Sequence, residues 1–135
     1  MTENKKENLN NRMIKFLFEG APVRGACVQM AEEWQEMIKF HHYPENVAAL
    51  LGQFTAGALL LSSTIKFEGS LILQVKGSGP IAFIYAEVRN PMSVRAMAEI
   101  REGAEIKPEM DLQELINKDG KGLCALILDP KDRRP

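Results

Sequence analysis

The stretch VAALLGQFTAGALLL, residues 47–61, decides the fold of this chain. Wound as a helix it is apolar on nearly every side, and such a helix lies either inside a protein or inside a membrane. A membrane span needs about 18 or more consecutive apolar residues, whereas this run is shorter and carries Gln53 in its middle. The sequence therefore predicts a buried core helix that begins at Pro44 and ends near Lys66.

Two glycines inside this predicted helix, Gly52 and Gly57, indicate close packing. Glycine in a helix interior costs about 1 kcal/mol relative to alanine, and contact with neighbours on several sides would offset that cost. Ala48, Gly52 and Ala56 recur every four residues and form a row small enough for another element to approach. We therefore expect cover on more than one face of the helix, with Gln53 as a buried polar group that needs a partner.

Composition and charge restrict the class of protein. The length of 135 residues fits one domain, and the formal net charge of -1 provides no basic surface for nucleic acid. Residues 1–12 are polar and predict a disordered leader, without the apolar segment of a secretory signal. Cys27 and Cys124 lie far apart and fit no ligand spacing, which favours the reducing cytoplasm.

The segments around the central helix follow the periods of strands and short helices. Residues 81–88 are apolar on both faces, so they predict a central strand. In chain order we expect strands over 13–19 and 23–30, an amphipathic helix over 31–40, the central helix, strands over 71–76, 81–88 and 92–100, a helical turn over 111–117 and a strand over 122–128.

This order predicts an α+β protein in which the buried central helix lies between antiparallel sheets, in a layered β/α/β core. The last strand, 122–128, is apolar on both faces and should be paired on both sides. Residues 129–135 have the composition of a hairpin tip, and no partner strand follows them. We therefore expect a truncated chain: a leader over 1–12 and an incomplete core domain over 13–135.

Most groups that could carry chemistry have a structural interpretation. His41 and His42 are adjacent and have no third ligand at a useful spacing, so a helix end is favoured over a metal site. The run KGSG, residues 76–79, leads through Pro80 into a strand, which favours a hairpin turn over a phosphate loop. Cys27 is expected to be a buried free thiol.

The charged groups are interpreted in the same way. Glu32, Glu33 and Glu36 form an acidic helix face that is expected to be solvated. Arg24, within an apolar strand, is expected to pair with Glu19 across the turn. The residues therefore predict no catalytic, cofactor-binding or metal-binding site in this chain.

Several segments occur in an order that resembles a known family. They are FLFE over 16–19, VRG over 23–25, HYP over 42–44, STIKFEG over 63–69 and LQVKGSGP over 73–80. Together they resemble the N-terminal core of the heat-shock protein 33 family, the redox-regulated holdase chaperones of bacteria. The resemblance covers residues 13–128, nearly the whole chain.

The resemblance implies a core with a helix between layers of sheet. It also implies an ATP-independent chaperone, not an enzyme, that binds unfolding proteins under oxidative stress and prevents their aggregation, often as a homodimer. In that family the switch is a separate C-terminal zinc domain with a C-x-C and a C-x-x-C pair. This sequence contains neither pair, and Cys27 and Cys124 do not correspond to them. Zinc is therefore expected only in the full-length parent protein.

Two other classes of protein stay open at this point. A long apolar helix wrapped by an antiparallel sheet is also the outline of a small hot-dog-like acyl-thioester hydrolase. Such an enzyme would need a carboxylate near the helix start, where Glu45 is the candidate, helped by Gln53. The third possibility is a non-enzymatic interaction module that uses an exposed sheet edge.

Overall fold

The computed structural model describes residues 12–39, 41–65, 68–89 and 93–130, and its architecture is α+β, as predicted. The elements are β1 (Arg12–Leu17), β2 (Arg24–Gln29), α1 (Glu32–Lys39), α2 (Glu45–Ser63), β3 (Gly69–Lys76), β4 (Ile81–Arg89), β5 (Ser93–Ile100), α3 (Leu112–Ile116) and β6 (Leu123–Pro130). Nearly all of the expected leader, and the end of the expected hairpin tip, lie outside the described residues.

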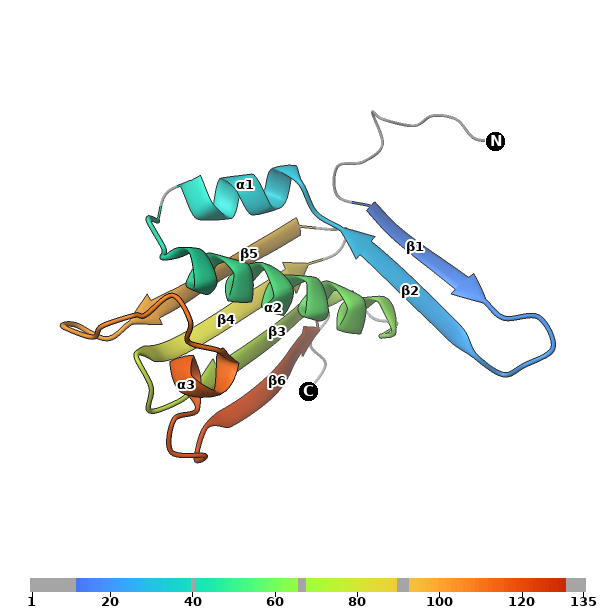
Figure 1. Cartoon of the computed structure of the whole chain (residues 1–135). Coiled ribbons are helices and arrows are strands. Elements are labelled where there is room, and N and C mark those ends of the chain that lie inside the picture. The colour runs from blue at the N-terminus through green and yellow to red at the C-terminus, as the bar shows by residue number, and fades with distance from the viewer. Residues whose placement is uncertain (1–11, 40, 66–67, 90–92, 131–135) are drawn as a thin grey trace.

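The main sheet has four antiparallel strands in the order β5-β4-β3-β6 (Figure 1). The prediction of a central strand over 81–88 is confirmed, because β4 pairs with both β3 and β5. The predicted hairpin turn over 76–79 is confirmed as well, since it joins β3 to β4 with Lys76 opposite Phe83. Strand β6 pairs with β3 and is an edge of this sheet among the described strands.

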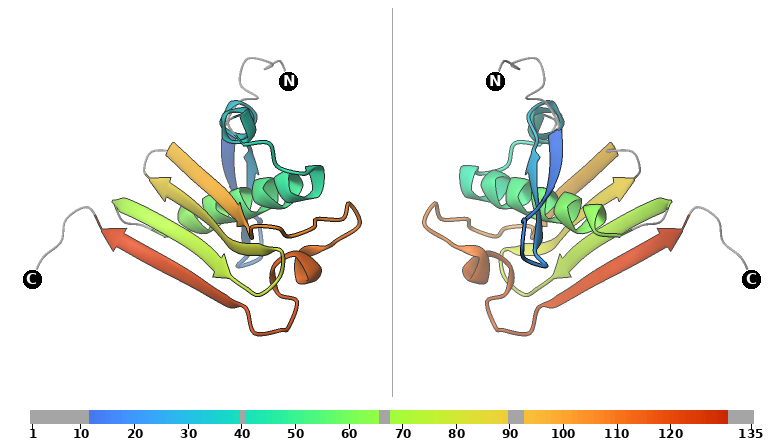
Figure 2. Two further views of the ribbon diagram at one scale, coloured as in Figure 1. Left: turned by 90° about the vertical axis from the view of Figure 1, so that its left-hand side faces the viewer. Right: turned by 90° about the vertical axis from the view of Figure 1, so that its right-hand side faces the viewer.

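Helix α2 crosses one face of the main sheet (Figures 1 and 2). Its side toward the sheet is fully buried and consists of Val47, Leu51, Thr55, Ala58 and Leu59. The Thr55 hydroxyl donates to the Leu51 carbonyl oxygen at 2.7 Å, which satisfies the one polar group in this row. Among the described helices α2 is the one long and apolar enough to span a membrane by length and composition, and its packing on the sheet is that of a core helix.

Gly52, one of the small residues on α2, faces Trp34 of α1. A Cβ built on Gly52 would lie 2.6 Å from Trp34 Nε1, so the indole occupies the space that a side chain at this position would need. The expectation that α2 is covered on more than one face is confirmed here.

Two expectations of burial are wrong. Gln53 is exposed, so its amide is solvated and does not need a protein partner. Cys27 is also exposed. It lies on β2, in a hairpin that packs on the main core through its base.

The β1–β2 hairpin is the second antiparallel sheet, with Leu17 opposite Arg24 at its distal end. Its base packs on the main core through Met13, Val28 and Met30. Its tip projects away from the body of the molecule (Figure 1).

Helix α3 closes the other end of the main sheet. Asp111 and Glu114 form a capping box at its start, which satisfies backbone donors that have no partner within the helix. Its Leu115 and Ile116 are buried in the same cluster as Leu51.

Candidate functional site

An apolar groove of about 1050 Å³ lies between the β1–β2 hairpin and the C-terminal half of α2. Its walls come from three parts of the chain. They are Lys15, Phe16 and Leu17 with Arg24, Gly25 and Ala26 from the hairpin, Gly57, Leu60, Leu61, Ser63 and Thr64 from α2, and Leu73 from β3.

The α2 wall of the groove follows from helical spacing. Gly57, Leu60, Leu61 and Thr64 stand at positions i, i+3, i+4 and i+7, so they share one face of the helix. A Cβ on Gly57 would meet no atom within 4 Å, so this glycine widens the opening. The hydroxyl of Thr64 donates to the Leu61 carbonyl oxygen at 2.8 Å, which removes a donor from the groove and leaves this wall largely apolar.

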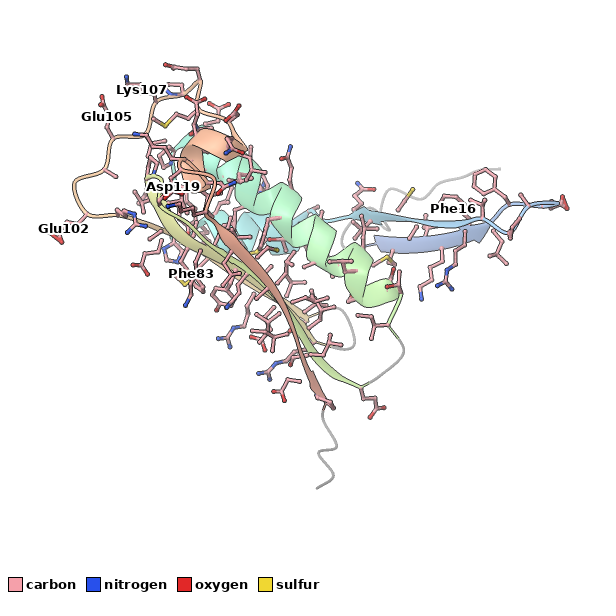
Figure 3. All side chains as sticks on the ribbon, turned by 90° about the horizontal axis from the view of Figure 1, so that it is seen from below. Phe16, Phe83, Glu102, Glu105, Lys107 and Asp119 are labelled. Carbon is pink, nitrogen blue, oxygen red and sulfur yellow. The ribbon has the colours of Figure 1, made fainter. Side chains whose placement is uncertain are left out.

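The hairpin wall is formed by aromatic and aliphatic side chains on a narrow two-stranded ribbon. The Phe16 ring lies over Gly25, in the space where that residue would carry a side chain. Phe16 also contacts Phe18 with the ring centroids 5.8 Å apart. Phe16 is 41% exposed and Leu17 is 80% exposed, and Figure 3 shows Phe16 on the hairpin, far from the main sheet.

The charges that line the groove are Lys15 and Arg24, without a carboxylate among the lining residues. Arg24 lies opposite Leu17 in the register. Within the described part of the chain no ion pair joins Arg24 to Glu19, so the expected pairing across the turn is not formed. The groove is therefore apolar with a basic rim.

The residues considered for chemistry are spread over the molecule. His41 stacks on Tyr43 with centroids 5.2 Å apart, and His42 is exposed. Glu45 is exposed in the first turn of α2. No three metal-ligating side chains cluster within the ranges that the structure describes.

Glu32 and Glu36 of the acidic face of α1 are exposed, as predicted, whereas the side chain of Glu33 lies outside the described part of the structure. The charged side chains Glu102, Glu105 and Lys107 lie on the loop after β5, which extends away from the sheet (Figure 3).

One contact that sequence reasoning missed holds the turn between β3 and β4. The Arg101 guanidinium donates through Nε to the Gly79 carbonyl oxygen at 2.9 Å and through Nη2 to that of Gly77. Beside this turn, hydrogen bonds from the Lys121 amide and the Ser78 hydroxyl lower the pKa of Asp119 below its ordinary value of 3.8. These interactions are structural and bring no reactive groups together.

The described residues thus form an α+β core that leaves an apolar groove open. Open apolar surface of this kind is typical of a protein that binds other polypeptides.

The chain belongs to the Hsp33 family, because the model of that family, described as Hsp33 protein, matches residues 11–135. The resemblance found in the sequence is therefore confirmed.

Curated relatives agree with the family match. A 33 kDa chaperonin of Neisseria gonorrhoeae (strain NCCP11945) is 39% identical over 128 residues, 95% of this chain and 42% of the relative. The 33 kDa chaperonin of Aliivibrio salmonicida is 38% identical over 123 residues, 91% of this chain and 40% of the relative. The one from Shewanella woodyi is 35% identical over 127 residues, 94% and 41% of the two chains.

The chain thus spans about two fifths of the length of these relatives. These relatives are named as chaperonins and not as enzymes, which bears out the prediction that this protein is not an enzyme, and their names do not support the thioester hydrolase alternative.

Proposed function

We propose that this protein acts as an ATP-independent holdase chaperone that binds unfolding proteins under oxidative stress and prevents their aggregation. The observation that carries the proposal is the family match over residues 11–135, together with relatives named 33 kDa chaperonin. The open apolar groove supports it, because a holdase must present apolar surface to clients.

Redox regulation is part of the same proposal and rests on the family resemblance. In the full-length protein, zinc would be held by thiolates of a C-x-C and a C-x-x-C pair in a separate domain. Oxidation of those thiolates to disulfides would release the metal and unfold the neighbouring region. Cys27 and Cys124 lie on different sheets, on β2 and β6, so we assign the switch to residues outside this chain.

We also propose that the protein works as a homodimer in the cytoplasm. The dimer is carried over from the family, and the cytoplasm from the two unpaired cysteines. Size-exclusion chromatography with static light scattering measures the first, and a monomeric mass at working concentration would contradict it.

The test of the function follows light scattering of citrate synthase as it unfolds on heating. The full-length protein, first oxidised with peroxide, should suppress aggregation without ATP. The same protein kept in dithiothreitol is the matched control and should suppress it much less. Aggregation that proceeds equally with the oxidised protein and with buffer would refute the holdase proposal, and equal suppression by both forms would refute the redox switch.

A further inference from the structure

The face of the main sheet that points away from α2, called here the outer face, carries a second apolar surface. Alternate residues of a strand point to opposite sides, and the core clusters place Ile84, Ala86 and Val88 of β4 toward α2. Phe83 and Tyr85 of the same strand therefore point away from it, as Figure 3 shows for Phe83.

The strand register arranges the outer face in rows across β5, β4, β3 and β6. Neighbouring positions in a row are direct cross-strand partners. The rows are Glu99, Phe83, Lys76 and Leu123; then Met97, Tyr85, Gln74 and Ala125; then Arg95, Glu87, Ile72 and Ile127.

The centre of the outer face is aromatic. Phe83 and Tyr85 stack with ring centroids 5.7 Å apart, and Lys76 Nζ lies 5.9 Å from the Phe83 centroid. Met97 stands beside Tyr85 in the register. Tyrosine, phenylalanine and methionine are enriched at the centres of protein–protein interfaces, and flexible methionine adapts to varied partners.

Aliphatic residues of β3 and β6 extend this surface. Ile72 lies opposite Ile127, Ile127 is 41% exposed, and Leu123, at the β6 end of the first row, is 67% exposed. No described helix or strand packs over this face, since α2 lies on the other side of the sheet (Figure 2).

The charges of the outer face balance one another. Its cations are Lys76, Arg89 and Arg95, and its anions are Glu87, Glu99 and Asp129. Glu87 accepts a hydrogen bond from Arg89 Nε at 3.0 Å, with the Glu87 side chain only 12% exposed. Nucleic acid would need an excess of cations here, whereas an uncharged polypeptide fits an apolar centre rimmed by both signs.

We propose that the outer face, centred on Phe83 and Tyr85, binds unfolded polypeptide, in particular extended uncharged segments with aromatic and aliphatic side chains. The proposal rests on the proposed holdase function and names its binding surface. A sheet held by hydrogen bonds across four strands is already ordered, so binding on it requires little ordering of the chaperone.

The test measures fluorescence anisotropy of labelled, reduced and carboxymethylated α-lactalbumin, a permanently unfolded probe, titrated with the full-length oxidised protein. The double variant Phe83→Thr/Tyr85→Thr keeps strand-forming residues and should raise the Kd at least tenfold. The matched control Ile14→Thr removes an exposed apolar residue from β1, outside the lining of the groove, and should change the Kd less than twofold. Circular dichroism and thermal unfolding check that each variant folds.

A native protein that binds no probe refutes the holdase function itself. If the native protein and a folded double variant bind the probe equally well, the holdase function stands and only the assignment of the outer face as its binding site is overturned. If the double variant does not fold, p-benzoylphenylalanine at position 85 replaces it: light-induced crosslinks to α-lactalbumin support the proposal, and their absence overturns it. The double variant could instead lose binding of single-stranded RNA, or lose dimerisation, while it still binds the probe. Either result would assign the outer face to that partner and not to the client.

Discussion

Gly52 and Gly57 form a matched pair for testing how α2 is covered. Alanine at either position should gain about 0.5–1 kcal/mol in stability from backbone entropy and helix propensity. At Gly57 a Cβ meets no atom within 4 Å, so Gly57→Ala should keep this gain. At Gly52 the Cβ would lie 2.6 Å from Trp34 Nε1 and 3.1 Å from Trp34 Cδ1, so the indole of Trp34 must move.

Overpacking of this kind costs about 1–3 kcal/mol. After subtraction of the propensity gain, Gly52→Ala should range from neutral to about 2.5 kcal/mol destabilising. The two variants should therefore differ by about 1–3 kcal/mol, with Gly57→Ala the more stable.

Urea unfolding followed by circular dichroism measures the difference, and the fluorescence of Trp34, the only tryptophan in the chain, reports the displacement. Its emission should shift in Gly52→Ala and stay unchanged in Gly57→Ala. Equal stabilities together with unchanged emission in both variants would refute the contact between α1 and α2.

Three further predictions concern α3 and the turn beneath it. Gly77→Ala would place a Cβ on the Ile116 carbonyl oxygen. Because backbone cannot yield as a side chain does, urea unfolding should show a loss of stability of at least about 3 kcal/mol. A loss under about 1 kcal/mol would contradict this packing. Asp111→Ala removes the capping box and should lower the stability by about 0.5–2 kcal/mol in the same measurement. An unchanged stability would mean that the cap does not form in solution. The lowered pKa of Asp119 favours the folded state above pH 3.8, and this contribution disappears as pH falls through the folded pKa. Asp119→Asn should therefore show a shallower fall of Tm in acid, and a fall as steep as in the native protein would argue against the Ser78 and Lys121 hydrogen bonds.

Local periodicity was sufficient to predict the elements. The apolar run over 47–61 corresponds to α2, whose last helical residue, Ser63, lies close to the predicted end. The two-sided apolarity of 81–88 identified β4 as central. Both signals come from residues that are near one another in the chain, so they can be recognised without knowledge of tertiary contacts.

The incorrect predictions of burial concern residues whose exposure depends on elements distant in the chain. Gln53 lies in the middle of an apolar helix, yet it is exposed, because apolar neighbours along a helix do not show which of its sides another element reaches. Cys27 is also exposed, because the apolar neighbours of a residue on a strand do not show which face of the strand another element covers. The contact from Arg101 to the carbonyl oxygens of Gly77 and Gly79 spans more than twenty residues, and no local pattern indicates it.

Gly57 shows why the groove could not be predicted from the sequence. The sequence predicts close packing at both glycines of α2, which is correct for Gly52 and wrong for Gly57, where the missing side chain leaves open space. The sequence could not separate the two cases, because the hairpin that forms the opposite wall is more than thirty residues away.

The groove and the outer face differ in how they are built, and the difference decides which of them should hold clients. The groove lies between the end of a helix and a hairpin that contacts the core at its base, so we expect that a ligand there would also have to hold the distal part of the hairpin in place, at a cost in entropy. The outer face belongs to one continuous sheet whose strands are fixed by their own hydrogen bonds. Its aromatic centre is therefore already in position before a client arrives. A groove variant such as Leu61→Ser should consequently weaken probe binding less than Phe83→Thr/Tyr85→Thr does, and the opposite ranking would move the client site to the groove.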